Sequence, residues 1–187
     1  MRTFIAVSLP QGIKQQLGLL QEQLKRSAAD VKWVQPHNIH VTLKFLGEIE
    51  EQKLGQITAM LQDTVKDKAC FTASMSGLGA FPRMTAPRVI WSGINKGKED
   101  LIRIAKELEE KSGILGVPPE DRPFTCHLTL GRVRSSANLH RLVKILTETA
   151  QQPDQEFPVT KLTLFKSTLA PTGPVYEPLT EASLITT

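Results

Sequence analysis

The amino-acid sequence predicts an α+β fold built from two related halves, and three observations support this prediction. Apolar runs typical of strands alternate along the chain with segments whose apolar residues recur at helical spacing. The order strand, helix, strand, helix, strand occurs twice, and the second copy is displaced by 87 residues, the separation of His40 and His127. The chain has 187 residues, 40% apolar and 22% charged, so it is long enough to bury one sizeable core.

Three strands and two helices are expected in the first half. The strands cover residues 4–9, 39–46 and 71–81, each an apolar run that a Pro or Gly follows. The first helix follows Pro10 and continues to about residue 28. The second begins near Glu50, because negative charge stabilises a helix N-terminus.

The second half repeats this order after a loop that contains two Pro and two Arg residues, over residues 82–88. Strands are expected at residues 89–94, 125–133, 157–169 and 175–185. One helix carries its apolar residues over 101–108 and ends before Gly113, and another begins at about Ser136. We therefore expect one two-lobed domain over residues 1–187, whose internal repeat covers roughly residues 1–85 and 86–187.

Charge, cysteine content and hydropathy restrict the class of protein. The net charge of +4, from 23 basic and 19 acidic residues, mildly favours a polyanionic partner. Cys70 and Cys126 form no disulfide pattern, which indicates a reducing compartment. The sequence shows neither a signal peptide nor an apolar run of the roughly 18–20 residues that a membrane span needs. We expect a cytoplasmic protein with no membrane partner.

The two halves carry the same tetrapeptide pattern, His-x-Thr-x, at equivalent positions of predicted strands. It reads His40-Val-Thr-Leu43 in the first half and His127-Leu-Thr-Leu130 in the second. Successive side chains of a strand point to opposite faces, so each His shares a face with its Thr while the two apolar residues anchor the other face. If the halves pack around a pseudo-two-fold axis, the two His-Thr pairs face one another across a groove.

Two imidazoles and two hydroxyls in one groove suit phosphoryl chemistry. Histidine has an unperturbed pKa near 6.5, so near neutral pH one ring can act as general acid while the other acts as general base. Threonine hydroxyls can donate hydrogen bonds to phosphate oxygens without adding charge. We predict that His40 and His127 are catalytic and that Thr42 and Thr129 bind phosphate.

Other chemistries are less well supported by the sequence. It contains no His-Glu-x-x-His motif, no paired Cys-x-x-Cys and no carboxylate cluster, so no metal and no cofactor are expected. Cys126 points away from the face of His127 and is interpreted as a small buried apolar residue. His37, in a loop, and His140, in a predicted helix, are assigned structural or solvated roles.

Three basic residues are weaker candidates for phosphate contacts. Lys44 has the same strand parity as Thr42 and is equally well explained as a solvated side chain. Arg132 and Arg134 follow the second motif and suit bidentate phosphate binding. Strict alternation places Arg132 on the opposite face, so its contact requires either a bulge near Gly131 or the end of the strand there.

Three aromatic residues near the motifs, Trp33, Phe45 and Phe124, have two interpretations. Aromatic side chains stack on unpaired bases in RNA-binding sites. A role in the apolar core is the favoured interpretation for all three, because each lies within or beside an apolar run.

Four segments together resemble a known family. They are residues 2–10, residues 33–47, Phe81-Pro82 followed by residues 87–91, and residues 124–132. The sequence resembles the two-histidine phosphoesterase superfamily and, within it, the bacterial and archaeal RNA 2',3'-cyclic phosphodiesterases, long described as 2'-5' RNA ligases. The resemblance covers most of the chain.

The resemblance implies a bilobal α+β fold with antiparallel sheets flanking a central groove and a pseudo-two-fold axis. It implies metal-independent opening of a 2',3'-cyclic phosphate at an RNA end to leave a 2'-phosphomonoester, with His40 as proton donor and His127 as proton acceptor. The expected partner is an RNA or oligonucleotide with such an end, and the expected state is a monomer. Two alternatives stay open: reversible 2'-5' ligation of RNA, and an RNA-binding module without catalysis.

Overall fold

The computed structural model describes residues 1–171 and 173–186, and within these residues it shows four α-helices and one nine-stranded sheet. The α-helices are α1 (Gln11–Lys25), α2 (Leu54–Val65), α3 (Lys98–Ile114) and α4 (Leu139–Glu148). The strands are β1 (Arg2–Ser8), β2 (Val31–Trp33), β3 (His40–Glu48), β4 (Phe71–Arg83), β5 (Ala86–Ile94), β6 (His127–Val133), β7 (Gln155–Val159), β8 (Lys161–Ala170) and β9 (Gly173–Ser183). The predicted α+β class is confirmed.

The strands follow the order β7-β4-β5-β6-β3-β1-β8-β9, with β2 also beside β6, and all pairs are antiparallel. This order is symmetric about the junction of β3 and β6, the two strands that carry the repeated motif. Among the described residues, the junction contains a single backbone pair, Val41 with Leu128. The sheet therefore opens at its centre, between the two copies of the motif.

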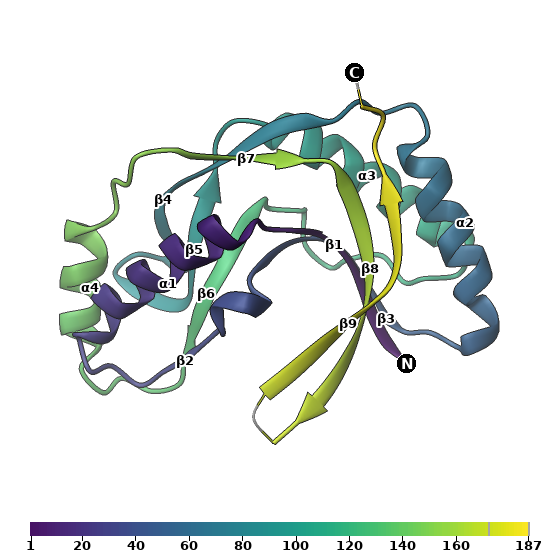
Figure 1. The fold of residues 1–187 in the computed structure, drawn as a ribbon. Helices are drawn as coiled ribbons and strands as arrows, with labels where there is room; N and C mark the ends of the chain where they lie inside the picture. The colour runs from purple at the N-terminus through teal and green to yellow at the C-terminus, as the bar shows by residue number, and fades with distance from the viewer. Residues whose placement is uncertain (172, 187) are drawn as a thin grey trace.

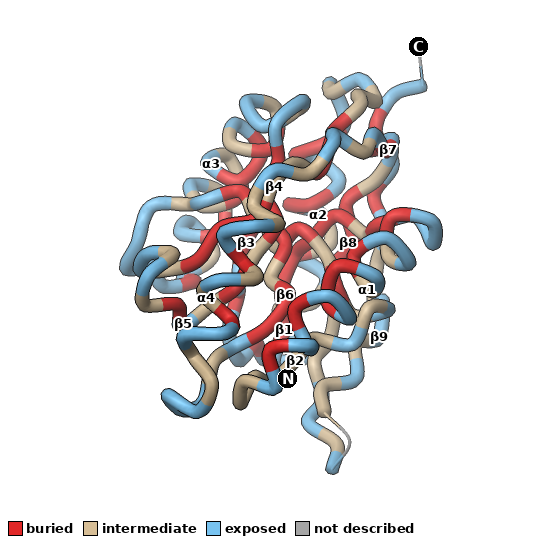
Figure 2. Tube along the Cα trace, turned by 90° about the vertical axis from the view of Figure 1, so that its left-hand side faces the viewer, coloured by how far each residue is buried: buried red, intermediate tan, exposed pale blue. Residues whose placement is uncertain are grey.

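The helices cover the two sides of the sheet separately. α1 contacts α4 at one side, and α2 and α3 contact each other and the strands β3, β8 and β9 at the other (Figure 1). In α1, Leu17 and Leu24 are fully buried, and in α3 Leu101 and Leu108 are fully buried, as expected when each helix faces the sheet with one apolar stripe. Burying a leucine side chain stabilises the fold by about 1.5–3 kcal/mol, so these stripes hold the helices against the strands. Figure 2 shows the buried positions running along the strands beneath the helices.

Each lobe contains strands from both halves of the sequence. β8, from the second half, pairs with β1, and β4, from the first half, pairs with β5. The turn between β4 and β5, at residues 84–85, lies where the sequence repeat divides. The two halves therefore exchange strands, which fixes the positions of the two motif strands relative to one another.

Two sequence predictions about strands are wrong. The expected strand over residues 157–169 is two strands, β7 and β8, which separate at Thr160 and pair with β4 and β1 at different places in the sheet. The buried apolar residues change phase at this point, from Phe157 and Val159 to Leu162 and Leu164, and the sequence prediction of one continuous strand passed over this change. The strand β2 was not expected, because three residues are too few to show a period.

Two predicted boundaries also differ. The loop expected over residues 82–88 is the tight end of the β4–β5 hairpin, whose strands reach Arg83 and resume at Ala86. Helix α3 was expected to end before Gly113 but continues to Ile114, because Gly113 does not adopt a positive φ. The turn that ends the helix contains Gly116, whose φ is +81°. Within the described residues, no helix combines the length and hydropathy that crossing a membrane requires.

Candidate active site

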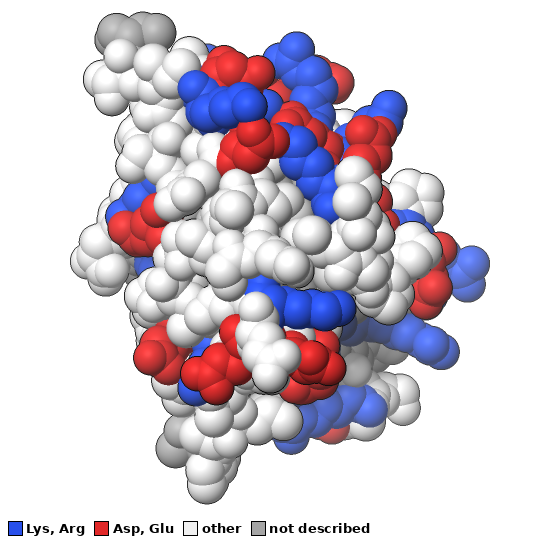
Figure 3. Space-filling view, turned by 90° about the vertical axis from the view of Figure 1, so that its right-hand side faces the viewer, with Lys and Arg blue, Asp and Glu red and all other residues white. Residues whose placement is uncertain are grey.

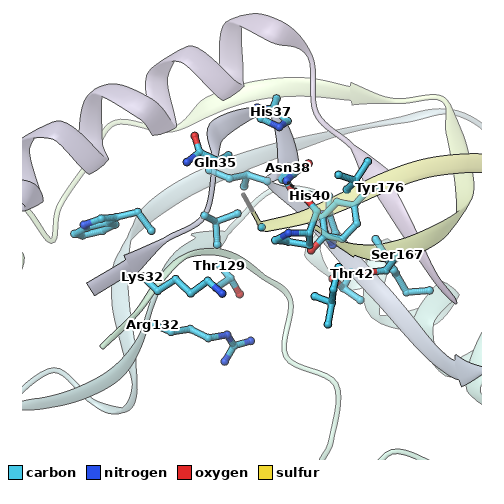
Figure 4. A pocket seen from close by; sticks show the side chains of 18 of the residues that line it. Lys32, Gln35, His37, Asn38, His40, Thr42, Thr129, Arg132, Ser167 and Tyr176 are labelled. Carbon is cyan, nitrogen blue, oxygen red and sulfur yellow. Dashed lines mark hydrogen bonds between the residues drawn. The ribbon is translucent and has the colours of Figure 1, made fainter. Parts of the chain in front are cut away.

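A groove of about 820 Å³ lies where β3 and β6 diverge, and both copies of the motif line it. His40 and Thr42 enter from β3, and His127 and Thr129 enter from β6. Val41 pairs with Leu128, and both apolar side chains point to one face of the sheet. The residues on either side of each therefore point to the other face. The sequence pattern therefore brings the four candidate side chains into one cavity. Figure 4 shows three of them, His40, Thr42 and Thr129.

His40 is held in a cluster of aromatic rings. It stacks on Phe4 with 4.8 Å between ring centroids and meets the edge of Tyr176 at 5.3 Å. Its Nδ1 lies 2.7 Å from the carbonyl oxygen of Asn38. Burial disfavours the protonated ring and, together with the positive charge of Lys14, lowers the pKa of His40 to about 4.

His127 has similar surroundings in the other half of the groove. Its Nδ1 lies 2.6 Å from the carbonyl oxygen of Thr125, and its ring meets Phe81 edge-on at 5.2 Å and Trp91 at 6.4 Å. Burial and the positive charge of Arg132 lower the pKa of His127 below its ordinary value.

The same backbone bond orients both imidazoles. A carbonyl oxygen only accepts hydrogen bonds, so in each ring Nδ1 carries the hydrogen and donates it to the residue two positions earlier. Nε2 is left as the ring nitrogen for proton transfer.

The residues between donor and acceptor, Ile39 and Cys126, are both buried, and burial raises the pKa of the Cys126 thiol to about 12. Cys126 is therefore a packing residue at neutral pH, as the sequence indicated.

Equivalent bulges interrupt β3 and β6. The register of β3 with β1 skips Leu43, and the register of β6 with β5 skips Leu130. A bulge adds one residue and reverses the side-chain alternation beyond it. As a result, Phe45 and Arg132 occupy equivalent positions and both line the groove. The bulge that a groove-facing Arg132 requires is present, and Phe45 is 51% exposed, so its expected core role is wrong.

The β3 bulge corrects the expectation for Lys44. Its side chain leaves the groove face and is buried, with Nζ 2.7 Å from Glu109 and 3.2 Å from the carbonyl oxygen of Pro118. Lys44 therefore joins β3 to α3 and the following loop. Arg134 also lies outside the groove lining, beyond the end of β6, where its backbone N–H donates to Asp30.

Several groove residues were not identified from the sequence as site residues. They are Arg2, Lys32, Gln35, Asn38, Ser167, Leu169, Pro174, Val175 and Tyr176, together with the backbone neighbours Val34, Ile39 and Gly173. Most of these come from β2 and from the β8–β9 hairpin, whose place beside the motif strands depends on pairings distant in sequence. Trp33 and the exposed His37 lie at the groove, while Phe124 does not line it and His140 is exposed on α4.

The groove is cationic. Three basic residues, Arg2, Lys32 and Arg132, line it, and its lining within the described chain contains no Asp or Glu. Among the described residues, no three His, Cys, Asp or Glu side chains gather in the manner of a metal-ligand set. The groove thus offers imidazoles, hydroxyls and cations to an anionic ligand.

Comparison with known proteins identifies the family. The family model described as LigT like Phosphoesterase matches the chain twice, over residues 7–91 and 93–176. The chain belongs to the LigT-like phosphoesterase family. The two matches place one motif in each segment, His40-x-Thr42 in the first and His127-x-Thr129 in the second.

Relatives in this family support the same class of enzyme. The chain is 34% identical to a protein named RNA 2',3'-cyclic phosphodiesterase from Methanothermobacter thermautotrophicus, over 94% of both chains. It is 36% identical to a protein of the same name from Methanocaldococcus jannaschii, over 97% of this chain and 99% of that one. This LigT-like phosphoesterase is therefore a hydrolase of the phosphodiesterase class.

Solved structures of the family share the fold. TT0787 of Thermus thermophilus superposes with a TM-score of 0.81 at 32% identity, covering 98% of both chains. LigT of Escherichia coli, solved in complex with 3'-AMP, superposes with a TM-score of 0.77 at 25% identity, covering 98% of this chain and 97% of that one. The duplicated, pseudo-symmetric fold class predicted from the sequence is confirmed.

Proposed function

We propose that this LigT-like phosphoesterase is an RNA 2',3'-cyclic phosphodiesterase that uses His40 and His127 as an acid–base pair and leaves a 2'-phosphomonoester. The observation that carries the proposal is the groove itself, which receives a His-Thr pair from each half of the chain. Both imidazoles are oriented by the same Nδ1 bond, which leaves Nε2 for proton transfer. The names of the relatives supply the substrate class.

The proposed reaction transfers one proton at each histidine. Nε2 of His127 takes a proton from a water molecule, whose oxygen bonds to phosphorus. The bond between phosphorus and the 3'-oxygen breaks, and His40 gives its proton to that oxygen. The products are a 3'-hydroxyl and a 2'-phosphomonoester, and the two histidines exchange protonation states. General acid and general base roles each typically contribute about 10²–10⁴ in rate.

Because the pKa values of both histidines are lowered, the bound phosphate is needed to keep His40 protonated near neutral pH. In the free enzyme burial holds both rings neutral near pH 7, which suits the base His127 but not the acid His40. An anionic phosphodiester within a few ångströms favours a protonated imidazole and raises its pKa. Substrate binding is therefore expected to bring the proton to His40, so that the acid is charged only when a phosphate is present.

The remaining polar groups of the motif strands suit phosphate binding. Thr42 and Thr129 lie on the same faces as the histidines and can donate hydrogen bonds to the non-bridging oxygens. Arg132 adds a positive charge beside His127, the position at which charge develops as water attacks. None of these steps uses a metal ion.

An assay with chelators tests the acid–base proposal against metal catalysis. Hydrolysis of an oligonucleotide 2',3'-cyclic phosphate is expected to proceed at the same rate before and after exhaustive dialysis against EDTA. Loss of activity in EDTA and its return with zinc would contradict the proposal. Tight binding of the oligonucleotide without turnover would instead favour a non-catalytic RNA-binding module, and joining of cyclic-phosphate and 5'-hydroxyl fragments in excess over hydrolysis would favour the ligase.

A further inference from the structure

Two groove cations lie directly opposite one another on neighbouring strands. Lys32 of β2 pairs in register with Arg132 of β6, and both line the groove. Side chains in such positions have Cβ atoms about 4.5–5.5 Å apart, and like charges there repel. In the part of the chain that the structure describes, neither side chain forms a salt bridge. An anion between them would remove the repulsion.

The charges on the face formed by α2 and α3 are arranged differently. On this face, Lys111 binds Asp63 at 2.6 Å and Glu107 at 2.7 Å, and Lys68 binds Glu107 at 2.7 Å. Figure 3 shows acidic and basic side chains intermingled on this face. The groove differs from this face because its lining, within the described chain, contains basic residues and no Asp or Glu.

The position of Lys32 separates it from the catalytic histidines. Beyond the pairing of Val41 with Leu128, β3 turns away and β2 takes its place beside β6. Because of the bulge, Thr129 and Arg132 are successive groove-facing positions on β6. Their partners on β5, Trp91 and Val89, are two residues apart, which corresponds to a step of about 6.7 Å. This step is similar to the spacing of neighbouring phosphates along a single RNA strand. Burial and, with it, the positive charge of Arg132 lower the pKa of His127, so Arg132 lies near that ring.

The two ends of the groove differ in chemistry although their backbones are equivalent. Phe45 occupies the position on β3 that Arg132 occupies on β6. Figure 4 shows Lys32, Thr129 and Arg132 at one side of the cavity and Thr42, Ser167 and Tyr176 at the other. Single-stranded RNA is bound by proteins through cations along its backbone and aromatic rings against its bases. The asymmetry gives the strand one preferred direction in the groove.

We propose that Lys32, beside Arg132, binds the internucleotide phosphate on the 5' side of the terminal nucleotide and thereby makes the enzyme selective for the end of an RNA strand over a nucleoside 2',3'-cyclic phosphate. The inference rests on the proposed function, because it takes the reacting phosphate to lie between the two His-Thr pairs. Lys32 is a specificity residue in this account and takes no part in proton transfer.

Three substrates test the role of Lys32. They are a nucleoside 2',3'-cyclic phosphate, a dinucleotide ending in the same cyclic phosphate, and that dinucleotide with a neutral methylphosphonate in place of the internucleotide phosphate. Lys32→Met is expected to lower kcat/KM for the charged dinucleotide about tenfold more than for the other two, the effect of losing a hydrogen bond to a charged group. The dependence of log kcat/KM on log salt should also become shallower by roughly 0.7 for the charged dinucleotide alone. Lys106→Met, at an exposed position on α3 outside the groove lining, is the matched control and should change none of these values.

The outcomes separate this inference from the proposed function. An equal loss of kcat/KM with all three substrates would mean that Lys32 binds the reacting phosphate or stabilises the fold. This result would overturn the inference but not the proposed function, because the wild type still hydrolyses the substrates. Equal rates for wild type and Lys32→Met with every substrate would also overturn it. Failure of the wild type to hydrolyse any of the three would contradict the proposed function itself, and the inference with it.

Discussion

At the scale of single residues, strand parity was a reliable guide only as far as the bulges. It placed His40, Thr42, His127 and Thr129 in one groove, because all four precede the irregular positions in their strands. It failed for Lys44, because the extra residue at Leu43 reverses the alternation. No pattern in the sequence marks that leucine as a bulge, whereas in the second strand a bulge near Gly131 was one of two conditions for an Arg132 that faces the groove.

The lowered pKa values of the histidines predict the pH dependence of catalysis. Burial disfavours the charged form, so both groups of the free enzyme titrate below 6.5, with that of His40 at about 4. The profile of kcat/KM reports the free enzyme and is expected to be bell-shaped with its maximum below pH 6.5. The profile of kcat reports the complex, in which the phosphate raises the pKa of His40, so its descending limb should lie at higher pH. A kcat/KM that is constant or still rising between pH 6.5 and 8 would contradict this assignment.

Lys44→Met tests whether this lysine is structural. The substitution removes a buried ammonium that binds Glu109 and the carbonyl oxygen of Pro118. We expect a loss of about 1–3 kcal/mol in the free energy of unfolding, because Glu109 is partly exposed and water can solvate it once the lysine is gone. Urea denaturation gives the stability, and kcat/KM at 25 °C should change less than about twofold. A tenfold loss of kcat/KM with unchanged stability would restore Lys44 to the phosphate site.

At the scale of elements, contacts between neighbouring strands position the two imidazole rings proposed to be catalytic. The sequence predicted the strands better than the contacts between them. Trp91 of β5 lies over Gly79 of β4 and packs beside Phe81 and His127. A Cβ at Gly79 would lie 2.2 Å from the indole ring. The glycine is therefore required by the close approach of Trp91, a relation between two strands that the sequence of either strand does not show.

Gly79→Ala is accordingly expected to impair both stability and catalysis. The methyl group would displace the indole ring of Trp91, which packs beside His127, so we expect a loss of about 1–3 kcal/mol in unfolding free energy and a reduced kcat. The near-UV circular dichroism of the two tryptophans reports the displacement directly. Gly55→Ala is the control, since a Cβ at this helical position meets nothing within 4 Å and should be neutral or stabilising by about 0.5–1 kcal/mol. Unaltered melting, spectrum and kcat in Gly79→Ala would show that Trp91 does not support the ring of His127.

At the scale of the whole molecule, the repeat in the sequence predicted the duplication but not the exchange of strands between lobes. Equal spacing of the two motifs indicated two equivalent units, and the symmetric strand order agrees with that expectation. The pairing of β8 with β1 and of β4 with β5 depends on register over long separations, which local periodicity does not encode. In the part of the chain that the structure describes, a single backbone pair joins the two motif strands, and the groove lies where they diverge.

The most direct test of the account combines kinetics with the identity of the product. An oligonucleotide 2',3'-cyclic phosphate is incubated with the wild type, His40→Ala and His127→Ala, and ³¹P NMR follows the position of the phosphate. The account predicts a 2'-phosphomonoester from the wild type and a loss of at least about 10² in kcat in each variant, with unchanged far-UV circular dichroism. A 3'-phosphomonoester as the product, or wild-type turnover by either folded variant, would contradict the claim that the two histidines act together on one phosphate.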